Sequence, residues 1–235
     1  MSFNKLMERN KVRVCVISDT HLRHKKVIIP ECDLLICCGD FSSGGKKETV
    51  ESFAKWLEET PSKERVVVFG NHENKYVAQF PEARSWFTDH CTHAHLLLNE
   101  RVTLFGIEIF GGCYAIDRTL SEKQLVEMIQ GVDLVVTHEP PYSVVATDVE
   151  HLGSKILKKG IAETKCVKCH VFGHSHGDYG YQKINNILYV NAALCIKKST
   201  LKFKPMLLEY VEGETQVVNT FEAQTINRTN LEIEC

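Results

Sequence analysis

Long apolar segments are missing from this chain of 235 residues. No run approaches the roughly 20 apolar residues that a membrane-spanning helix needs, so we expect no contact with a membrane. Residues 1–10 also lack the apolar stretch and the small-residue cleavage site of a signal peptide. We therefore predict an intracellular, cytoplasmic protein.

A large excess of charge of one sign is lacking too. Lys and Arg total 28 and Asp and Glu total 30, a net charge of −2, which argues against non-specific binding to nucleic acid or membrane surfaces. With 43% hydrophobic and 25% charged residues, the composition excludes a wholly disordered chain. In the absence of repeats or an evident linker, we expect 1–235 to form one domain, with its core in 12–221 and a polar tail at 222–235 that frays.

The 10 cysteines do not indicate a disulfide framework. Cys15, Cys37 and Cys38 lie inside apolar runs, where a reduced cysteine packs as a small hydrophobic side chain. Two other cysteine patterns resemble metal or haem sites. The run 166–170 matches a haem-attachment pattern, but it precedes an apolar run in a chain without an export signal, and zinc binding would need a second Cys/His pair. The run 91–95 could bind a metal, but alternation along a strand edge explains its spacing.

Short, mostly β-branched apolar runs recur along the chain and predict buried strands. They are Val12–Ile17, Leu34–Cys38, Val66–Phe69, Leu134–Val136, Val171–Phe172 and Leu188–Val190. Between them, 48–59 and 121–129 carry helical apolar faces, and Ser121 with Gln124 fits a capping box at the start of the second. Gly106 separates two further strands, and a hairpin is expected over 206–221. This order predicts an α/β protein with mixed sheets.

Polar residues follow almost every one of these runs. The six runs are followed by Asp19-Thr20-His21, Gly39-Asp40, Gly70-Asn71-His72-Glu73, His138, Gly173-His174-Ser175-His176 and Asn191. Because ligands bind beyond the carboxyl ends of parallel strands, neighbouring strands would bring these residues to one rim. At this rim, Asn191 is expected either to contact the substrate or to position a metal ligand, or else only to complete a turn. Glu73 is given no chemical role.

The donor types at this rim favour divalent metals. Asp19 and His21 point the same way from an extended segment, as do His174 and His176. Imidazole, carboxylate and one amide oxygen, without thiolate, suit Mn²⁺, Fe, Zn²⁺ or Mg²⁺. Seven donors are too many for one open site, whereas two ions that share a carboxylate accommodate them.

The ordered motifs Asp19-x-His21, Gly39-Asp40, Gly70-Asn71-His72-Glu73, Thr137-His138 and Gly173-His174-Ser175-His176 resemble the calcineurin-like metallophosphoesterase superfamily. Within it, the chain is most similar to the metallophosphoesterase-domain-containing branch, which includes cyclic-nucleotide-phosphodiesterase-like proteins. The resemblance covers about residues 12–195. It implies a four-layer α-β-β-α sandwich with two mixed β-sheets.

The resemblance also implies roles for individual side chains. Asp19, His21 and His176 would hold the first of two divalent metal ions, most simply Mn²⁺. Asn71, His138 and His174 would hold the second. Asp40 would bridge them, and His72 would not bind metal but would protonate the leaving oxygen. The implied reaction is hydrolysis of a small phosphodiester, possibly a cyclic nucleotide, by a metal-bridging hydroxide.

Other readings stay open for the substrate and for the class of protein. The tryptophan-rich insertion of the branch is replaced here by Gly111-Gly112-Cys113-Tyr114, which implies a different and more open substrate rim. A phosphomonoesterase or protein phosphatase would share the same metal core. A non-catalytic scaffold with this fold would lack the histidine of the Gly-Asn-His motif, which here is His72. Nucleic acid is disfavoured as a partner, and the oligomeric state is undetermined.

Overall fold

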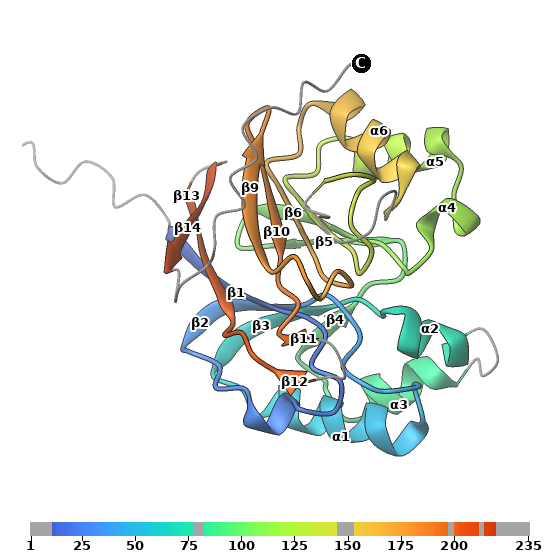
Figure 1. Ribbon diagram of the computed structural model, residues 1–235, viewed down its shortest axis with the longest axis vertical. Coiled ribbons are helices and arrows are strands. Elements are labelled where there is room, and N and C mark those ends of the chain that lie inside the picture. Colours follow the sequence, from blue (N-terminus) through green and yellow to red (C-terminus); the bar gives the residue numbers. More distant parts are fainter. Residues whose placement is uncertain (1–10, 78–81, 145–152, 197–199, 212–213, 220–235) are drawn as a thin grey trace, which may run out of the picture.

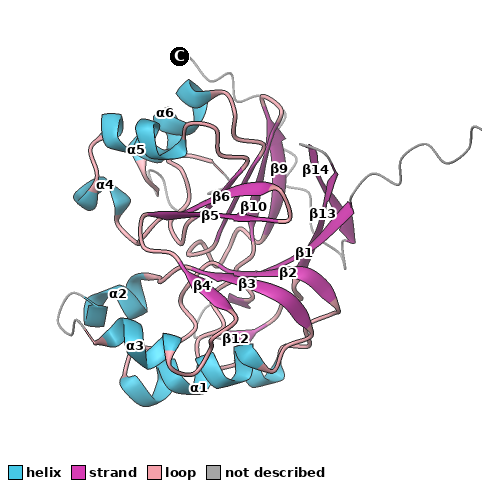
Figure 2. Ribbon diagram, turned by 180° about the vertical axis from the view of Figure 1, so that it is seen from behind, coloured by secondary structure: helices cyan, strands magenta, loops and turns pink. Residues whose placement is uncertain are grey.

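The computed structural model describes residues 11–77, 82–144, 153–196, 200–211 and 214–219. Two six-stranded sheets lie face to face, and helices cover the outer face of each sheet (Figures 1 and 2). The expected four-layer α-β-β-α sandwich is therefore confirmed. Among the described residues, no helix combines the length and the apolar character needed to cross a bilayer.

The first sheet has the strand order β14-β13-β1-β2-β3-β4. Strands β1 (Lys11–Ile17), β2 (Cys32–Cys37), β3 (Ser62–Val67) and β4 (Ala94–Leu96) run parallel, and the hairpin of β13 (Met206–Val211) and β14 (Glu214–Asn219) adds two antiparallel strands. All six residues of β2 are buried, which explains its unbroken apolar run. Helices α1 (Lys47–Glu58), α2 (Asn71–Val77) and α3 (Ala83–Thr88) lie on the side of this sheet away from the second sheet.

The second sheet has the strand order β5-β6-β7-β8-β10-β9. Strands β6 (Ile107–Gly111), β7 (Leu134–Val136), β8 (Cys169–Phe172) and β10 (Ile187–Asn191) are parallel, and β5 (Glu100–Leu104) and β9 (Gly180–Ile184) are antiparallel edges. Helices α4 (Ile116–Thr119), α5 (Glu122–Ile129) and α6 (Lys155–Thr164) cover it. A short 3-10 helix, η1 (His24–Lys26), and a pair β11 (Cys195–Ile196) and β12 (Thr200–Leu201) complete the fold.

The local predictions from the sequence are confirmed. Four of the six apolar runs lie wholly on strands, and the helices expected at 48–59 and 121–129 are α1 and α5. The other two, Leu34–Cys38 and Val66–Phe69, extend one and two residues beyond β2 and β3. The capping box is present, because Ser121 accepts a hydrogen bond from the Gln124 amide and the Gln124 side chain accepts one from the Ser121 amide. Gly106 lies in the turn between β5 and β6. The tail at 222–235 lies outside the described residues.

The strands that precede the polar motifs do not form one sheet. Strands β1, β2 and β3 belong to the first sheet, whereas β7, β8 and β10 belong to the second. The two sheets meet beyond the carboxyl ends of these strands, where Ser18 and Ala193 form an isolated parallel bridge and the Leu194 amide donates to the Ser18 carbonyl at 3.0 Å. The single rim expected from the sequence is therefore a seam between two sheets.

Candidate metal centre and active site

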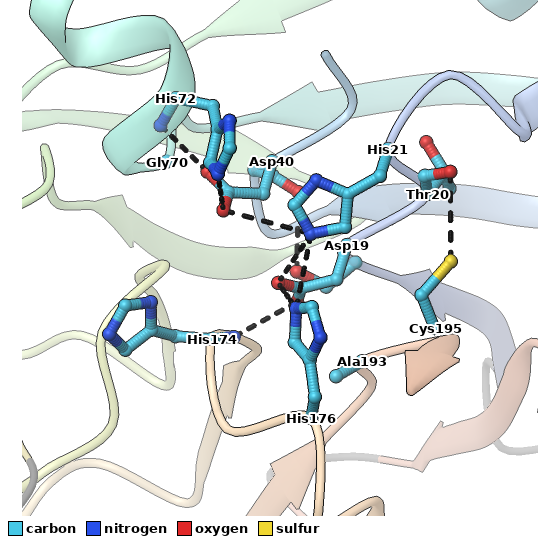
Figure 3. A network of polar contacts seen from close by, with 12 residues as sticks. Asp19, Thr20, His21, Asp40, Gly70, His72, His174, His176, Ala193 and Cys195 are labelled. Carbon is cyan, nitrogen blue, oxygen red and sulfur yellow. Dashed lines mark hydrogen bonds and ion pairs between the residues drawn. The ribbon is translucent and has the colours of Figure 1, made fainter. Parts of the chain in front are cut away.

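Loops from both sheets carry the candidate ligands into this seam (Figure 3). Asp19 and His21 follow β1, Asp40 follows β2, and Asn71 and His72 open α2 just after β3. From the second sheet, His138 follows β7, and His174 and His176 follow β8. The structure thus brings together every side chain that the sequence analysis proposed for the site.

Several of these loop residues have an unusual backbone conformation. Asp19, His21, Asp40 and His174 have φ angles of 54°, 39°, 51° and 68°, in the left-handed region that side chains with a Cβ seldom adopt. Backbone hydrogen bonds between the β1 and β2 loops hold them there, from the Asp19 amide to the Gly39 carbonyl and from the His21 amide to the Asp40 carbonyl, both at 3.0 Å. Strained residues of this kind cluster at functional sites because the surrounding structure stabilises them.

Two glycines leave room for the carboxylates of Asp40 and Asp19. A Cβ on Gly70 would lie 2.6 Å from the Asp40 amide nitrogen and 2.8 Å from its carboxyl carbon. A Cβ on Gly173 would lie 2.6 Å from the Ser18 Cβ and would overlap the Asp19 carboxylate. Carbon atoms pack at about 3.5–4.0 Å, so neither position can accept a side chain without moving a carboxylate.

One group of donor atoms is centred on Asp19. The Nε2 atoms of His21 and His176 lie 3.1 Å apart, and Asp19 Oδ1 lies 3.0 Å from His176 Nε2 and 3.8 Å from His21 Nε2. The second Asp19 oxygen accepts a hydrogen bond of 2.9 Å from the His174 amide, which fixes the carboxylate. Asp19 is fully buried.

A second group is centred on His138, which is also fully buried. Three potential acceptor atoms surround its Nε2: Asn71 Oδ1 at 3.0 Å, His174 Nδ1 at 3.2 Å and Asp40 Oδ2 at 3.4 Å. Asp40 Oδ2 also lies 4.0 Å from His21 Nε2, so this carboxylate faces both groups.

The tautomers of the two buried histidines suit metal binding. His138 Nδ1 lies 2.7 Å from the Cys38 carbonyl oxygen, and His21 Nδ1 lies 3.2 Å from the Ser42 carbonyl oxygen. A carbonyl only accepts hydrogen bonds, so Nδ1 carries the proton and Nε2 is left to bind a cation. The facing lone pairs around each Nε2 repel one another unless a proton or a metal ion lies between them. The donor set therefore fits divalent metal ions.

Electrostatics support the same reading. Burial opposes protonation of His138, but the carboxylates of Asp40 and Asp19 outweigh it and raise the pKa of His138 to about 10. Burial likewise opposes ionisation of Asp40, yet His138 and the hydrogen bond from the His72 amide hold the Asp40 pKa below its usual value. Two buried, ionised carboxylates create a field that attracts positive charge.

Within the described residues, three clusters of side chains place their ligand atoms within 4.8 Å of one another, close enough to hold a metal ion. They are Asp19–His21–His176, Asp40–His138–His174 and His21–Asp40–His72. Adjacent clusters share His21 or Asp40. The His72 ring lies at the open side of the seam, with 34% of its side chain exposed and its Nε2 3.7 Å from Asp40 Oδ2.

Glu73 has a structural role that the sequence analysis did not assign. Its buried carboxylate accepts hydrogen bonds from the amides of Gly70 (3.0 Å), Asp40 (2.9 Å) and Ser42 (2.9 Å) and from the Ser42 hydroxyl (2.6 Å). It therefore ties the loop after β2 to the start of α2. Its position three residues after Gly70, at the third residue of a helix, is the signal that predicts such a bond.

Two further residues border the centre. The side-chain nitrogen of Asn191 donates to the Ser175 carbonyl at 2.7 Å, and its side-chain oxygen accepts from the Ala193 backbone amide at 3.1 Å. Asn191 therefore holds the loop that carries His174 and His176. The Tyr114 ring lies 5.9 Å from the His138 ring and 5.7 Å from the His174 ring, between centroids. No spacing rule connects Tyr114 with histidines so distant in the sequence.

The cysteine-containing patterns lie elsewhere. His93 Nδ1 lies 2.5 Å and Cys91 Sγ 3.3 Å from the carboxylate of Glu58, while His95 contacts Glu64 at 3.1 Å. These residues flank or form the edge strand β4, as the alternation predicted, and none belongs to a metal-binding cluster within the described part of the chain. Cys166 is half-buried and Cys169 is buried, both as free thiols.

Comparison with known proteins agrees with this fold. The family profile of the calcineurin-like phosphoesterases matches residues 12–178. The human metallophosphoesterase domain-containing protein 1 is 29% identical over 225 residues, which cover 82% of this chain and 68% of that protein. A probable rhamnogalacturonate lyase C of Emericella nidulans is 31% identical over 74% of this chain, which spans only 18% of that longer protein.

A solved structure described as a novel archaeal phosphodiesterase superimposes with a TM-score of 0.52 at 13% identity, over 88% of this chain and 98% of that one, a likeness of fold. The two-sheet sandwich and the histidine–aspartate seam together define a metallophosphoesterase. This chain belongs to the calcineurin-like phosphoesterase family, a class of metal-dependent phosphoesterases.

Proposed function

We propose that this protein hydrolyses small phosphodiesters, cyclic nucleotides among them, with the help of two divalent metal ions. The observation that carries the proposal is the position of Asp40. Its Oδ2 lies between the group around Asp19 and the group around His138, 4.0 Å from His21 Nε2 and 3.4 Å from His138 Nε2. A single carboxylate that faces two ligand groups suits a bridged pair of ions.

Asp19, His21 and His176 would hold one ion, and Asn71, His138 and His174 the other, with Asp40 shared. When bound, the ions would neutralise charge on the phosphate and lower the pKa of a water molecule. Mn²⁺ is the first candidate because its preferred ligands include imidazole, carboxylate and amide oxygen; Fe, Zn²⁺ and Mg²⁺ are the alternatives.

His72 would complete the reaction as general acid. Its ring borders the seam, and the hydrogen bond of 3.0 Å from its own amide to Asp40 Oδ1 fixes its backbone against the proposed bridge. The partly exposed ring can reach a bound phosphate ester and can exchange protons with solvent. A proton donated from Nε2 to the leaving oxygen would stabilise the departing alcohol.

Tyr114 supports a substrate with a planar group. Its ring packs beside His138 and His174, and burial, reinforced by the charge of Glu139, raises the pKa of its hydroxyl, so the phenol stays neutral. An aromatic ring at this position suits a nucleobase next to the phosphate. The presence of His72 together with seven donors argues against a non-catalytic scaffold.

The first test compares variants. Asp40→Asn should abolish hydrolysis and lower metal content, measured by elemental analysis of protein purified without chelator. His72→Ala should reduce turnover by about 10²-fold or more, the contribution of a general acid, and should leave metal content largely unchanged. His95→Ala is the matched control, because its side chain has a similar exposure of 37% but pairs with Glu64 outside the site.

The second test is a substrate panel with Mn²⁺ present. The proposal expects higher kcat/KM for cyclic nucleotides and bis(p-nitrophenyl) phosphate than for p-nitrophenyl phosphate and phosphopeptides. The reverse order would assign the protein as a phosphomonoesterase or protein phosphatase. Retention of full turnover by His72→Ala would refute its role as the acid, and failure to bind any divalent metal would refute the whole proposal.

A further inference from the structure

A second cavity lies at the end of the second sheet that is remote from the metal centre. It has a volume of about 380 Å³ and lies between α6, the segment that leads into β8, and the β9–β10 turn at Asn185 and Asn186. Val167 and Lys168 line it just before β8 begins, whereas His174 follows the end of β8. The four residues of β8 span about 13 Å, so this cavity is separate from the candidate active site. Figure 1 shows α6 and the β9–β10 turn together at the top of the molecule.

The wall of the cavity is mainly aliphatic. Its apolar lining consists of Val144, Ile161, Ala162, Val167, Ile184 and Ile187. Its volume falls in the range of about 300–1,000 Å³ that is usual for small-molecule sites, which combine an apolar wall with a few polar groups. The cavity therefore suits a ligand with an apolar body.

Tyr189 supplies a hydrogen-bond donor in this wall. Its side chain is only 7% exposed and lines the cavity, while its ring packs against His170 at 6.0 Å between centroids. Its hydroxyl forms no hydrogen bond with the described residues and is not among their fully buried polar atoms that lack a partner, so it is accessible to water or to a ligand. Burial raises the pKa of Tyr189 to about 12, so the hydroxyl keeps its proton at neutral pH. The hydroxyl can therefore donate a hydrogen bond to a ligand in the cavity.

Three lysines give the cavity a positive charge. Lys158, Lys165 and Lys168 line it, and among the residues that the structure describes no carboxylate does. None of the three forms an ion pair with a carboxylate in the described part of the chain. By contrast, Lys159, on the same helix but outside the cavity, pairs with Glu122 at 3.2 Å. Ammonium groups that lack a carboxylate partner attract an anionic head group, and the aliphatic stems of these lysines extend the apolar surface.

We propose that this cavity is a binding site for a small organic anion with an apolar body, a short- to medium-chain carboxylate. The apolar tail would fill the aliphatic wall. The carboxylate would lie among the three lysines and accept a hydrogen bond from Tyr189. This site is independent of the phosphoesterase reaction, and its test does not use that activity.

Octanoate is the probe, titrated into the whole protein in an isothermal calorimeter. Two matched probes separate the contributions: acetate has the charge without the tail, and 1-octanol has the tail without the charge. Octanoate should bind saturably at one site and more tightly than either. Its affinity should fall as salt is raised, because ammonium–carboxylate attraction is screened.

Variants then locate the site. The double change Lys165→Ala with Lys168→Ala should raise the Kd for octanoate by about fivefold or more, as expected for the loss of two exposed ion pairs. Tyr189→Phe should raise it by about fivefold, the effect of one hydrogen bond. Lys155→Ala removes the same charge from α6 outside the cavity and should leave the Kd unchanged. A thermal melt of each of the three variants checks folding.

Three results would overturn the proposal: no saturable heat with octanoate, 1-octanol binding as tightly as octanoate, or the same Kd in the double lysine variant and the unchanged protein. Each bears only on this cavity. If the tests refuted the proposed phosphoesterase function, these three results would still decide whether the cavity binds the anion.

Discussion

Replacement of Gly173 by alanine is the sharpest test of how the metal centre is built. Gly173 is the first residue after β8 and directly precedes His174. The added Cβ would lie 2.6 Å from the Ser18 Cβ and would overlap the Asp19 carboxylate. Carbon atoms in contact are about 3.5 Å or more apart, so the loop and Asp19 must separate by about 1 Å. Asp19 is fully buried and cannot swing into solvent.

The displacement would disturb the contacts that hold the Asp19 carboxylate in position. Asp19 accepts from the His174 amide at 2.9 Å and lies 3.0 Å from His176 Nε2. A misplacement of about 1 Å at a catalytic group lowers the rate by about 10²-fold, and overpacking of a buried site costs about 1–3 kcal/mol of stability. We therefore expect Gly173→Ala to lose about 10²-fold in kcat/KM and to bind less metal, with moderately lower stability.

The assay combines three measurements on the same preparation: metal content by elemental analysis, kcat/KM with bis(p-nitrophenyl) phosphate, and the midpoint of urea unfolding. Gly160→Ala is the control. Gly160 lies in α6, and its Cβ would meet only side-chain atoms of α5, those of Leu125 at 3.3 Å and of Ile129 at 3.6 Å. A Gly173→Ala protein that kept full metal content and full activity would show that Asp19 is not held as described.

Three further predictions follow from buried polar groups. Glu73→Gln should lower the free energy of unfolding by about 1–3 kcal/mol, measured with urea, because an amide cannot accept from all four donors that the carboxylate binds; an unchanged midpoint would contradict this. Burial, with the charge of Lys25 second, lowers the pKa of His24 from 6.5 to about 4. The unfolded chain then takes up a proton first, so stability should be lost as pH falls from about 6.5 towards 4, and His24→Phe should flatten that dependence. Removal of metal with a chelator should lower the Tm, and Mn²⁺ should restore it, because the facing carboxylates of Asp19 and Asp40 lose their counter-charge.

The sequence predicts those parts of the fold that depend on near neighbours. Strand runs, the face of α1 and the capping box at Ser121 were all predicted, because alternation, helical period and a bond across three residues are local properties. The residue types that follow the strands also indicated the kinds of donor at the site. The extended segment expected at Asp19 and His21 was wrong, because both residues have left-handed backbone. Aspartate and histidine adopt left-handed backbone more often than most residues with a Cβ, but such residues are still uncommon, so the sequence could not indicate where these loops would require it.

The sequence alone determined the inventory: which strands and helices form, which donors follow them, and hence that metal chemistry is to be expected. Only the tertiary structure decided how the donors are grouped. His174 and His176 reach Asp19 across 155 and 157 residues, and the ligand-bearing strands divide between two sheets. The bonds of Glu73, the position of Tyr114 and the lysine-rimmed cavity likewise arise from packing between distant segments. The physical reason is that local rules fix conformation over a few residues, whereas contact between remote segments depends on how whole layers pack.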